Sequence, residues 1–111
     1  MTDARAKHEV DPNRFTGKTF MRSRTFPGSV DDYRVRIDGL TAGRIVHKKL
    51  SPQRTAWFWC LTAPHYPLQD IQHGEAQTYE GARDAFNKLF WQWHAWALKQ
   101  QGPVTWYGAI E

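Results

Sequence analysis

The sequence contains little cysteine and no long apolar run. Cys60 is the single cysteine among 111 residues, so the chain cannot form an intramolecular disulfide, and a thiolate metal site would need other kinds of ligand. No stretch reaches the roughly 18 consecutive apolar residues of a membrane-spanning helix. Residues 1–30 are polar and lack the apolar core of a signal peptide. We therefore expect a cytoplasmic protein without a membrane segment.

Recognised catalytic motifs are also missing. The sequence has no Gly-rich phosphate loop, Walker motif, nucleophile elbow or heptad repeat. The side chains with the chemistry to bind a metal or form a Cys-His pair are Cys60, His65, Asp70, His73 and Glu75. Because His65 and His73 match no standard ligand spacing and lie among turn residues, we expect no metal, no cofactor and no enzymatic activity. We interpret His94, between two tryptophans, as a partly buried packing residue.

Excess charge is absent from most of the chain. The formal net charge is +4, from 15 Lys and Arg against 11 Asp and Glu. Residues 33–50 carry five Lys or Arg and one Asp, and the remaining residues carry ten of each sign, so the whole surplus lies in residues 33–50.

A chain of 111 residues is long enough for one hydrophobic core. Aromatic residues make up 14% of the chain, so a few large rings decide how that core is built.

Residues 1–29 show no sustained period of 2 or 3.6 and end at a Pro-Gly pair. We predict a flexible or loosely docked arm there, followed by a single domain over residues 30–111. Residues 32–38 alternate polar and apolar side chains, which is typical of a half-buried strand, and Asp38-Gly39 is the preferred centre of a two-residue hairpin turn. The return strand is predicted over residues 40–50.

The hairpin register decides which side chains face the core. With a two-residue or a four-residue loop, the side chains expected to face the core are Tyr33, Val35, Ile37 and Val46. Those expected to face away are Arg34, Arg36, Ile45, His47 and Lys49. A three-residue loop would instead turn Ile45 and His47 inward.

The second half of the chain predicts one more strand and a long helix. Residues 55–62 are apolar on both faces and predict a third strand, residues 63–77 an irregular loop, and residues 79–100 a helix with Thr78 as its N-cap. One apolar stripe of the helix should lie on the sheet. The expected fold is therefore α+β, with a three-stranded antiparallel sheet packed on one long C-terminal helix, an N-terminal arm and a short C-terminal tail.

Several segments of this pattern resemble a group of short proteobacterial proteins of unknown function with a β-β-β-α plan. The segments are residues 33–39, 43–45, 57–59 and 74–78, with Ala82, Ala85, Phe86 and Trp93. The resemblance covers about residues 33–93 and implies no activity. More distantly, the plan is similar to the AP2-type DNA-binding domain, in which a three-stranded sheet presents Arg and Trp to the major groove.

Two binding functions are therefore predicted. The first is nucleic-acid binding by the basic hairpin and its neighbouring strand, through Arg34, Arg36, Arg44, Lys48, Lys49, Trp57 and Trp59. The simpler alternative is a solvated face whose charges prevent aggregation. The second is a protein partner or homodimer, because a second apolar stripe follows the helix. Its predicted interface is Trp91, Ala95, Leu98 and Trp106, unless the arm or the tail covers the stripe within the monomer.

Overall fold

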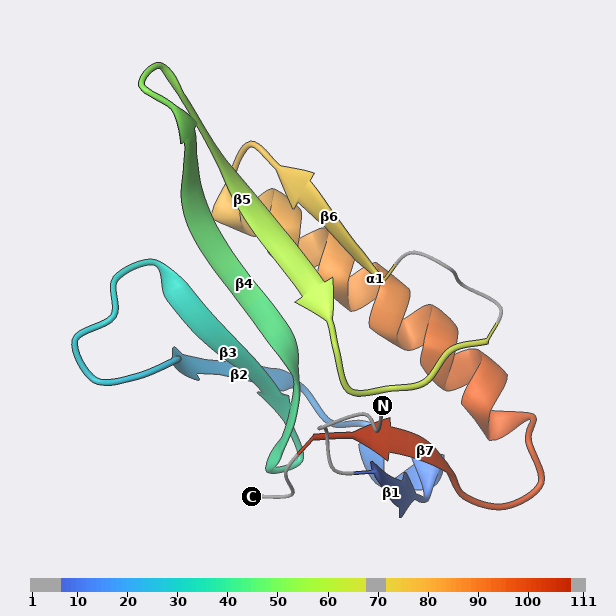
Figure 1. The fold of residues 1–111 in the computed structure, drawn as a ribbon. Coiled ribbons are helices and arrows are strands. Elements are labelled where there is room, and N and C mark those ends of the chain that lie inside the picture. The colour runs from blue at the N-terminus through green and yellow to red at the C-terminus, as the bar shows by residue number, and fades with distance from the viewer. Residues whose placement is uncertain (1–6, 68–71, 109–111) are drawn as a thin grey trace, which may run out of the picture.

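The computed structural model describes residues 7–67 and 72–108 and is an α+β fold made mostly of strands (Figure 1). In chain order the elements are β1 (Lys7–Val10), the 3-10 helix η1 (Pro12–Phe15), β2 (Phe20–Arg24), β3 (Asp32–Ile37), β4 (Leu40–Ser51), β5 (Arg54–Leu61), β6 (His73–Ala76), α1 (Tyr79–Leu98) and β7 (Val104–Tyr107).

Two antiparallel sheets are formed by the described residues, and the predicted three-stranded sheet is wrong. Strands β2-β3-β4-β5-β6 make a five-stranded sheet in that order, and β1 pairs with β7 in a separate two-stranded sheet. The three predicted strands are β3, β4 and β5 at its centre. The edge strand β2 comes from the segment predicted as an arm, and β6 from the segment predicted as an irregular loop.

The predicted Asp38-Gly39 hairpin turn is confirmed, but the register changes soon after it. Asp38 and Gly39 have φ of 50° and 77°, as a type I′ turn requires, and Ile37 pairs with Leu40. A β-bulge follows, because Arg36 pairs with Thr41 and Val35 with Gly43. The bulge leaves Ala42 as an extra residue and exchanges the two faces of β4 beyond it.

The exchange overturns the predicted orientations of Ile45, Val46, His47 and Lys49. Tyr33 pairs with Ile45, which is 1% exposed, so Ile45 faces the core and not the solvent. Val46 pairs with Asp32 and points to the opposite side. We call the side of the sheet that carries Tyr33 and Ile45 the inner face, and the other side the outer face.

The helix α1 lies on the inner face, against β4, β5 and β6 (Figure 1). Its predicted N-cap is confirmed: the Thr78 hydroxyl accepts a hydrogen bond of 3.0 Å from the Gly81 N–H. The apolar stripe predicted to face the sheet is buried, as Ala82, Phe86, Leu89, Phe90, Trp93 and Ala97. Because α1 lies toward the β6 edge, it leaves the inner face of β2 and β3 less covered.

The N-terminal and C-terminal segments pair with each other and cover part of the helix. Residues predicted as an arm and a tail form β1 and β7, with His8 opposite Trp106 and Val10 opposite Val104. The η1 segment packs on α1, where the His94 ring nitrogen Nε2 lies 2.9 Å from the Pro12 carbonyl oxygen. The segments predicted as an arm and a tail therefore form strands of the two sheets. His94 is a buried packing residue.

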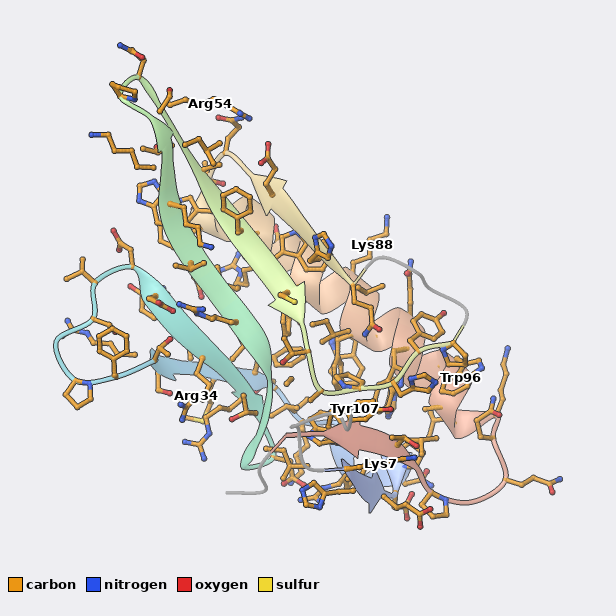
Figure 2. The ribbon with its side chains drawn as sticks, viewed as in Figure 1. Lys7, Arg34, Arg54, Lys88, Trp96 and Tyr107 are labelled. Atoms are coloured by element: carbon orange, nitrogen blue, oxygen red, sulfur yellow. The ribbon has the colours of Figure 1, made fainter. Side chains whose placement is uncertain are left out.

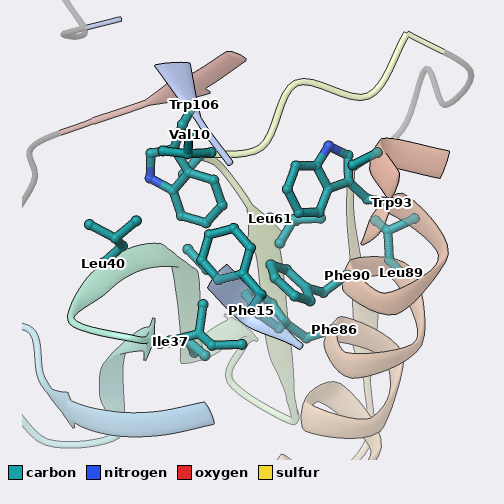
Figure 3. Close-up of a cluster of buried hydrophobic side chains, with 14 of the residues drawn as sticks. Val10, Phe15, Ile37, Leu40, Leu61, Phe86, Leu89, Phe90, Trp93 and Trp106 are labelled. Atoms are coloured by element: carbon teal, nitrogen blue, oxygen red, sulfur yellow. The ribbon is translucent and has the colours of Figure 1, made fainter. Parts of the chain in front are cut away.

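A single cluster of buried side chains joins both sheets and the helix (Figure 3). Phe15 lies at its centre, with ring centroids 5.7 Å from Phe90, 6.0 Å from Trp93 and 5.2 Å from Trp106. The hairpin contributes Ile37 and Leu40 to the same cluster. Large rings therefore fill the space where the two sheets and α1 meet.

Candidate nucleic-acid interface

Four predicted nucleic-acid-binding residues share the outer face. Arg34 and Arg44 are opposite each other on β3 and β4, and the strand alternation places Arg36 and Lys48 on the same side. Among the described elements, none packs on this face as α1 packs on the inner one. The bulge at Ala42 is the reason that Arg44 lies on the outer face. Without the bulge, Arg44 would pair with Tyr33 and its side chain would point toward the helix.

One carboxylate lies among these cations. The Arg44 guanidinium binds Asp32 with two hydrogen bonds, one of them from Nε to Oδ1 at 2.8 Å, and the Thr25 hydroxyl donates to the same Oδ1 at 2.6 Å. The hydrogen bonds from Arg44 hold the pKa of Asp32 below its ordinary value, although burial acts in the opposite direction. Asp32 therefore stays ionised and offsets one of the four positive charges.

The aromatic residue on this face is Phe58, which sequence reasoning did not select. Phe58 is half-buried and pairs with Val46, and the Lys48 ammonium lies 5.7 Å from the centroid of its ring. The position of Phe58 between Trp57 and Trp59 was the available signal in the sequence. Neighbouring residues on a strand point to opposite faces, so Phe58 had to lie on the face opposite to the two tryptophans.

The sheet separates the predicted tryptophans from the predicted cations. Trp57 lies on the inner face, stacked on His47 with ring centroids 4.8 Å apart. Trp59 is also on the inner face and pairs with Gly74, where an added Cβ would come within 2.9 Å of the indole. Lys49 alternates with Lys48 and points to the same side as the tryptophans, near the tip of the β4–β5 hairpin, where Figure 2 labels Arg54.

The predicted interface residues do not form one surface. Trp106 is fully buried against Phe15, and Trp91 is half-buried beside Phe20, with ring centroids 6.2 Å apart. Ala95 and Leu98 are exposed, with Leu98 at 43%.

A cleft of about 760 Å³ opens on the inner face between the sheet and α1. We call it the inner cleft. Its aromatic wall includes Tyr33, Trp57 and Tyr79, and the Arg22 guanidinium lies 4.3 Å and 4.5 Å from the ring centroids of the two tyrosines. Sequence reasoning missed this cleft because it assigned Arg22 to the arm. The alternation of Phe20, Arg22 and Arg24 was the available signal.

The residues considered for catalysis are only partly brought together. Cys60 and His73 are paired across β5 and β6, Glu75 forms an ion pair with Arg54 at 2.9 Å, and His65 lies apart, on the segment after β5. Asp70 lies outside the described residues. Within residues 7–67 and 72–108, no three His, Cys, Asp or Glu side chains are grouped as a metal site would require.

Comparison with known proteins gives no match to a family model, to a curated protein or to a solved structure. In the described part of the chain, α1 is too polar to cross a membrane.

Proposed function

We propose that this protein is a non-enzymatic binding module that binds single-stranded nucleic acid on its outer face. The observation that carries the proposal is the placement of Arg34 directly opposite Arg44 on an uncovered sheet face. Like charges in opposite positions on two strands destabilise a sheet. Asp32 offsets part of this repulsion through its ion pair with Arg44, and a polyanion bound across the face would offset more of it.

The proposed roles follow from the positions of the side chains. Arg34, Arg36 and Lys48 contact phosphates, and Phe58 offers part of its ring to a base. The charge of Arg44 is partly offset by Asp32. A single strand fits better than a duplex, because its bases are free to stack on an aromatic ring.

The test measures binding of a labelled mixed-sequence oligonucleotide of about twelve nucleotides by fluorescence anisotropy as the salt concentration is raised. In the test variant Arg34, Arg36 and Lys48 are changed to Ser. The matched control changes Lys7, Lys88 and Lys99 to Ser, which removes the same charge from exposed positions elsewhere. Removing three phosphate contacts should weaken binding at least about tenfold and reduce the slope of log K against log salt by roughly 2.

A second variant tests the aromatic contact. Phe58→Ala should weaken binding by roughly 1–3 kcal/mol, and Phe58→Tyr should keep most of the affinity because it keeps the ring. An equal loss in the test and control charge variants, or no binding by the wild type, would contradict the proposal.

Assembly through the helix remains the second candidate function. The observation in its favour is exposed Leu98 beside exposed Ala95 at the end of α1. The buried position of Trp106 makes the available apolar surface smaller than the sequence indicated. Light scattering on the wild type and on Leu98→Gln tests it: a dimer that dissociates on substitution would support assembly through this face.

A further inference from the structure

Strand β2 is an open edge of the five-stranded sheet. Among the described residues β2 pairs only with β3, and four of its five residues are exposed. The Thr25 N–H donates to the Asp32 carbonyl at 3.0 Å, so Thr25 directs its backbone groups toward β3. Because this direction alternates along an antiparallel strand, Arg22 and Arg24 direct their backbone N–H and C=O groups toward the open edge.

Each face of the sheet is hollowed beside this edge. The inner cleft includes Phe20 and Arg22 on one side of β2. On the other side lies a hollow of about 530 Å³, which includes Met21, Ser23 and Arg36 and which we call the outer hollow. An added strand sends successive side chains to opposite faces, and pockets for alternate side chains are what give strand addition its specificity.

The charge around the edge selects the partner. Lys18 lies just before β2 and lines both hollows, and Arg22 and Arg24 lie on the strand itself. The acidic groups nearby are partly engaged: Asp38 forms ion pairs with Arg14 at 2.8 Å and with Lys18 at 3.8 Å. Asp31 lies 3.8 Å from a ring nitrogen of His47, and Glu80 also lines the inner cleft. The strand itself is basic, so an acidic partner complements it.

A second copy of this chain fits the edge poorly. Antiparallel self-pairing must join residues whose backbone groups point outward on both copies. The register that pairs the whole strand places Arg22 opposite Arg22 of the second copy. A shift of two residues places Arg22 opposite Arg24 in one direction and Arg24 opposite Lys18 in the other. Like charges in opposite positions are unfavourable.

We propose that β2 binds an extended acidic peptide segment of another protein as a sixth strand of the sheet. Apolar side chains of the peptide enter the inner cleft, against Phe20 and Tyr33. Its carboxylates lie over the outer hollow, near Lys18 and Arg36. Backbone hydrogen bonds to Arg22 and Arg24 hold the peptide at the edge.

The probe is a fluorescein-labelled, end-capped peptide of about six residues that alternates valine and glutamate, a typical length for one strand. Two matched peptides separate the contribution of charge from that of backbone hydrogen bonds. One replaces glutamate by lysine, and the other carries N-methyl groups on the alternate backbone nitrogens that would face β2. The valine-glutamate peptide should bind, the lysine peptide should not, and the peptide methylated on the nitrogens that face β2 should bind at least about tenfold more weakly. Equal binding of the methylated and unmethylated peptides would overturn strand addition.

Variants of the protein test the same edge. Arg24→Ala removes a charge, whereas Arg24→Pro also removes a backbone N–H that faces the open edge, a position where an edge strand tolerates proline. Arg24→Pro should bind the peptide several-fold more weakly than Arg24→Ala, with unchanged circular dichroism. The N-methylated peptide, used with the wild type, keeps the test valid if Arg24→Pro does not fold. A doubling of mass in light scattering that Arg24→Pro abolishes would identify a second copy as the occupant and overturn the proposal.

Discussion

Asp32 connects three segments of the chain at a single carboxylate. It accepts hydrogen bonds from Thr25 after β2 and from Arg44 on β4, and only 12% of its side chain is exposed. Charge-assisted hydrogen bonds in such a protected place contribute more to stability than those of exposed ion pairs. Asp32 thus fixes the start of β3 and sets how much positive charge the outer face retains.

Asp32→Asn should lower the free energy of unfolding by roughly 1–3 kcal/mol at neutral pH. Folding lowers the pKa of Asp32, so its stabilising contribution is present above the pKa of the unfolded chain and is lost as the pH falls toward the folded value. The stabilities of the wild type and the variant should therefore converge below about pH 4. Urea unfolding at several pH values measures this.

The adjacent Asp31→Asn is the control. Asp31 carries the same charge, but its side chain contacts His47 at 3.8 Å and lies outside the hydrogen-bonded group around Asp32. A constant difference between wild type and Asp32→Asn at all pH values would show that the charge of Asp32 is not responsible.

Strand β4 depends on its bulge for the separation of apolar and basic side chains. Ala42, the extra residue, is fully buried, and its carbonyl accepts hydrogen bonds from the Thr62 N–H at 3.0 Å and the Ala63 N–H at 3.1 Å. The next residue, Gly43, has no room for a side chain, because an added Cβ would lie 2.0 Å from the Cys60 carbonyl oxygen. The bulge is thus fixed from both sides.

Deletion of Ala42 should destabilise the protein without exchanging the two faces of β4. The deletion joins Thr41 directly to Gly43 and keeps the pairs of β3 with β4, so Ile45 stays on the inner face. It removes a fully buried side chain and the carbonyl that accepts hydrogen bonds from Thr62 and Ala63, which lowers stability. Circular dichroism and thermal unfolding report the outcome. Deletion of the exposed Pro27 in the β2–β3 loop is the control and should be tolerated far better. A cooperatively folded Ala42 deletion with a normal melting temperature would contradict this account.

The elements that the sequence predicted are those whose signals are local. The Asp38-Gly39 turn and the Thr78 N-cap are confirmed because each depends on two to four neighbouring residues. The bulge leaves no such signal, so the faces of β4 were misassigned. Strand β6, His73–Ala76, has no β-branched or aromatic residue and forms only because β5 offers an edge.

The candidate site was predictable to a similar extent. The charge surplus identified Arg34, Arg36 and Lys48, which the structure places on one face. The pairing of these cations with Trp57 and Trp59 was an inference from proximity in sequence, and side-chain alternation separates them.

At the scale of the whole molecule, the small β1–β7 sheet connects the two ends of the described chain to the main core. It is anchored beyond its own pairing: the His65 N–H donates to the Thr105 carbonyl at 3.1 Å, and the Tyr107 N–H donates to the Ala63 carbonyl at 2.7 Å. The segment after β5 thereby ties β7 to the five-stranded sheet. Such pairing between distant segments carries no local signal, although the alternation of Val104 and Trp106 was available.

Trp106 is the side chain through which the small sheet joins the core. Its ring is fully buried between Phe15 and Trp93, so Trp106→Ala should lower the free energy of unfolding by about 3–5 kcal/mol. Among the described residues its indole N–H is buried without a hydrogen-bond partner, which carries a cost in the native protein. Trp106→Phe removes that donor and keeps a ring, so it should be clearly less destabilising than Trp106→Ala.

Denaturant unfolding, followed by tryptophan fluorescence and by far-ultraviolet circular dichroism, distinguishes two views of the small sheet. If both sheets share one core, each variant should unfold in a single transition that coincides for both probes, shifted to lower denaturant for Trp106→Ala. If the small sheet were an accessory unit, Trp106→Ala would leave the circular dichroism transition of the main sheet unchanged. The contacts of Phe15 with Phe90 and Trp93 of α1 favour the single transition, because loss of Trp106 opens the same cluster that holds the helix on the sheet.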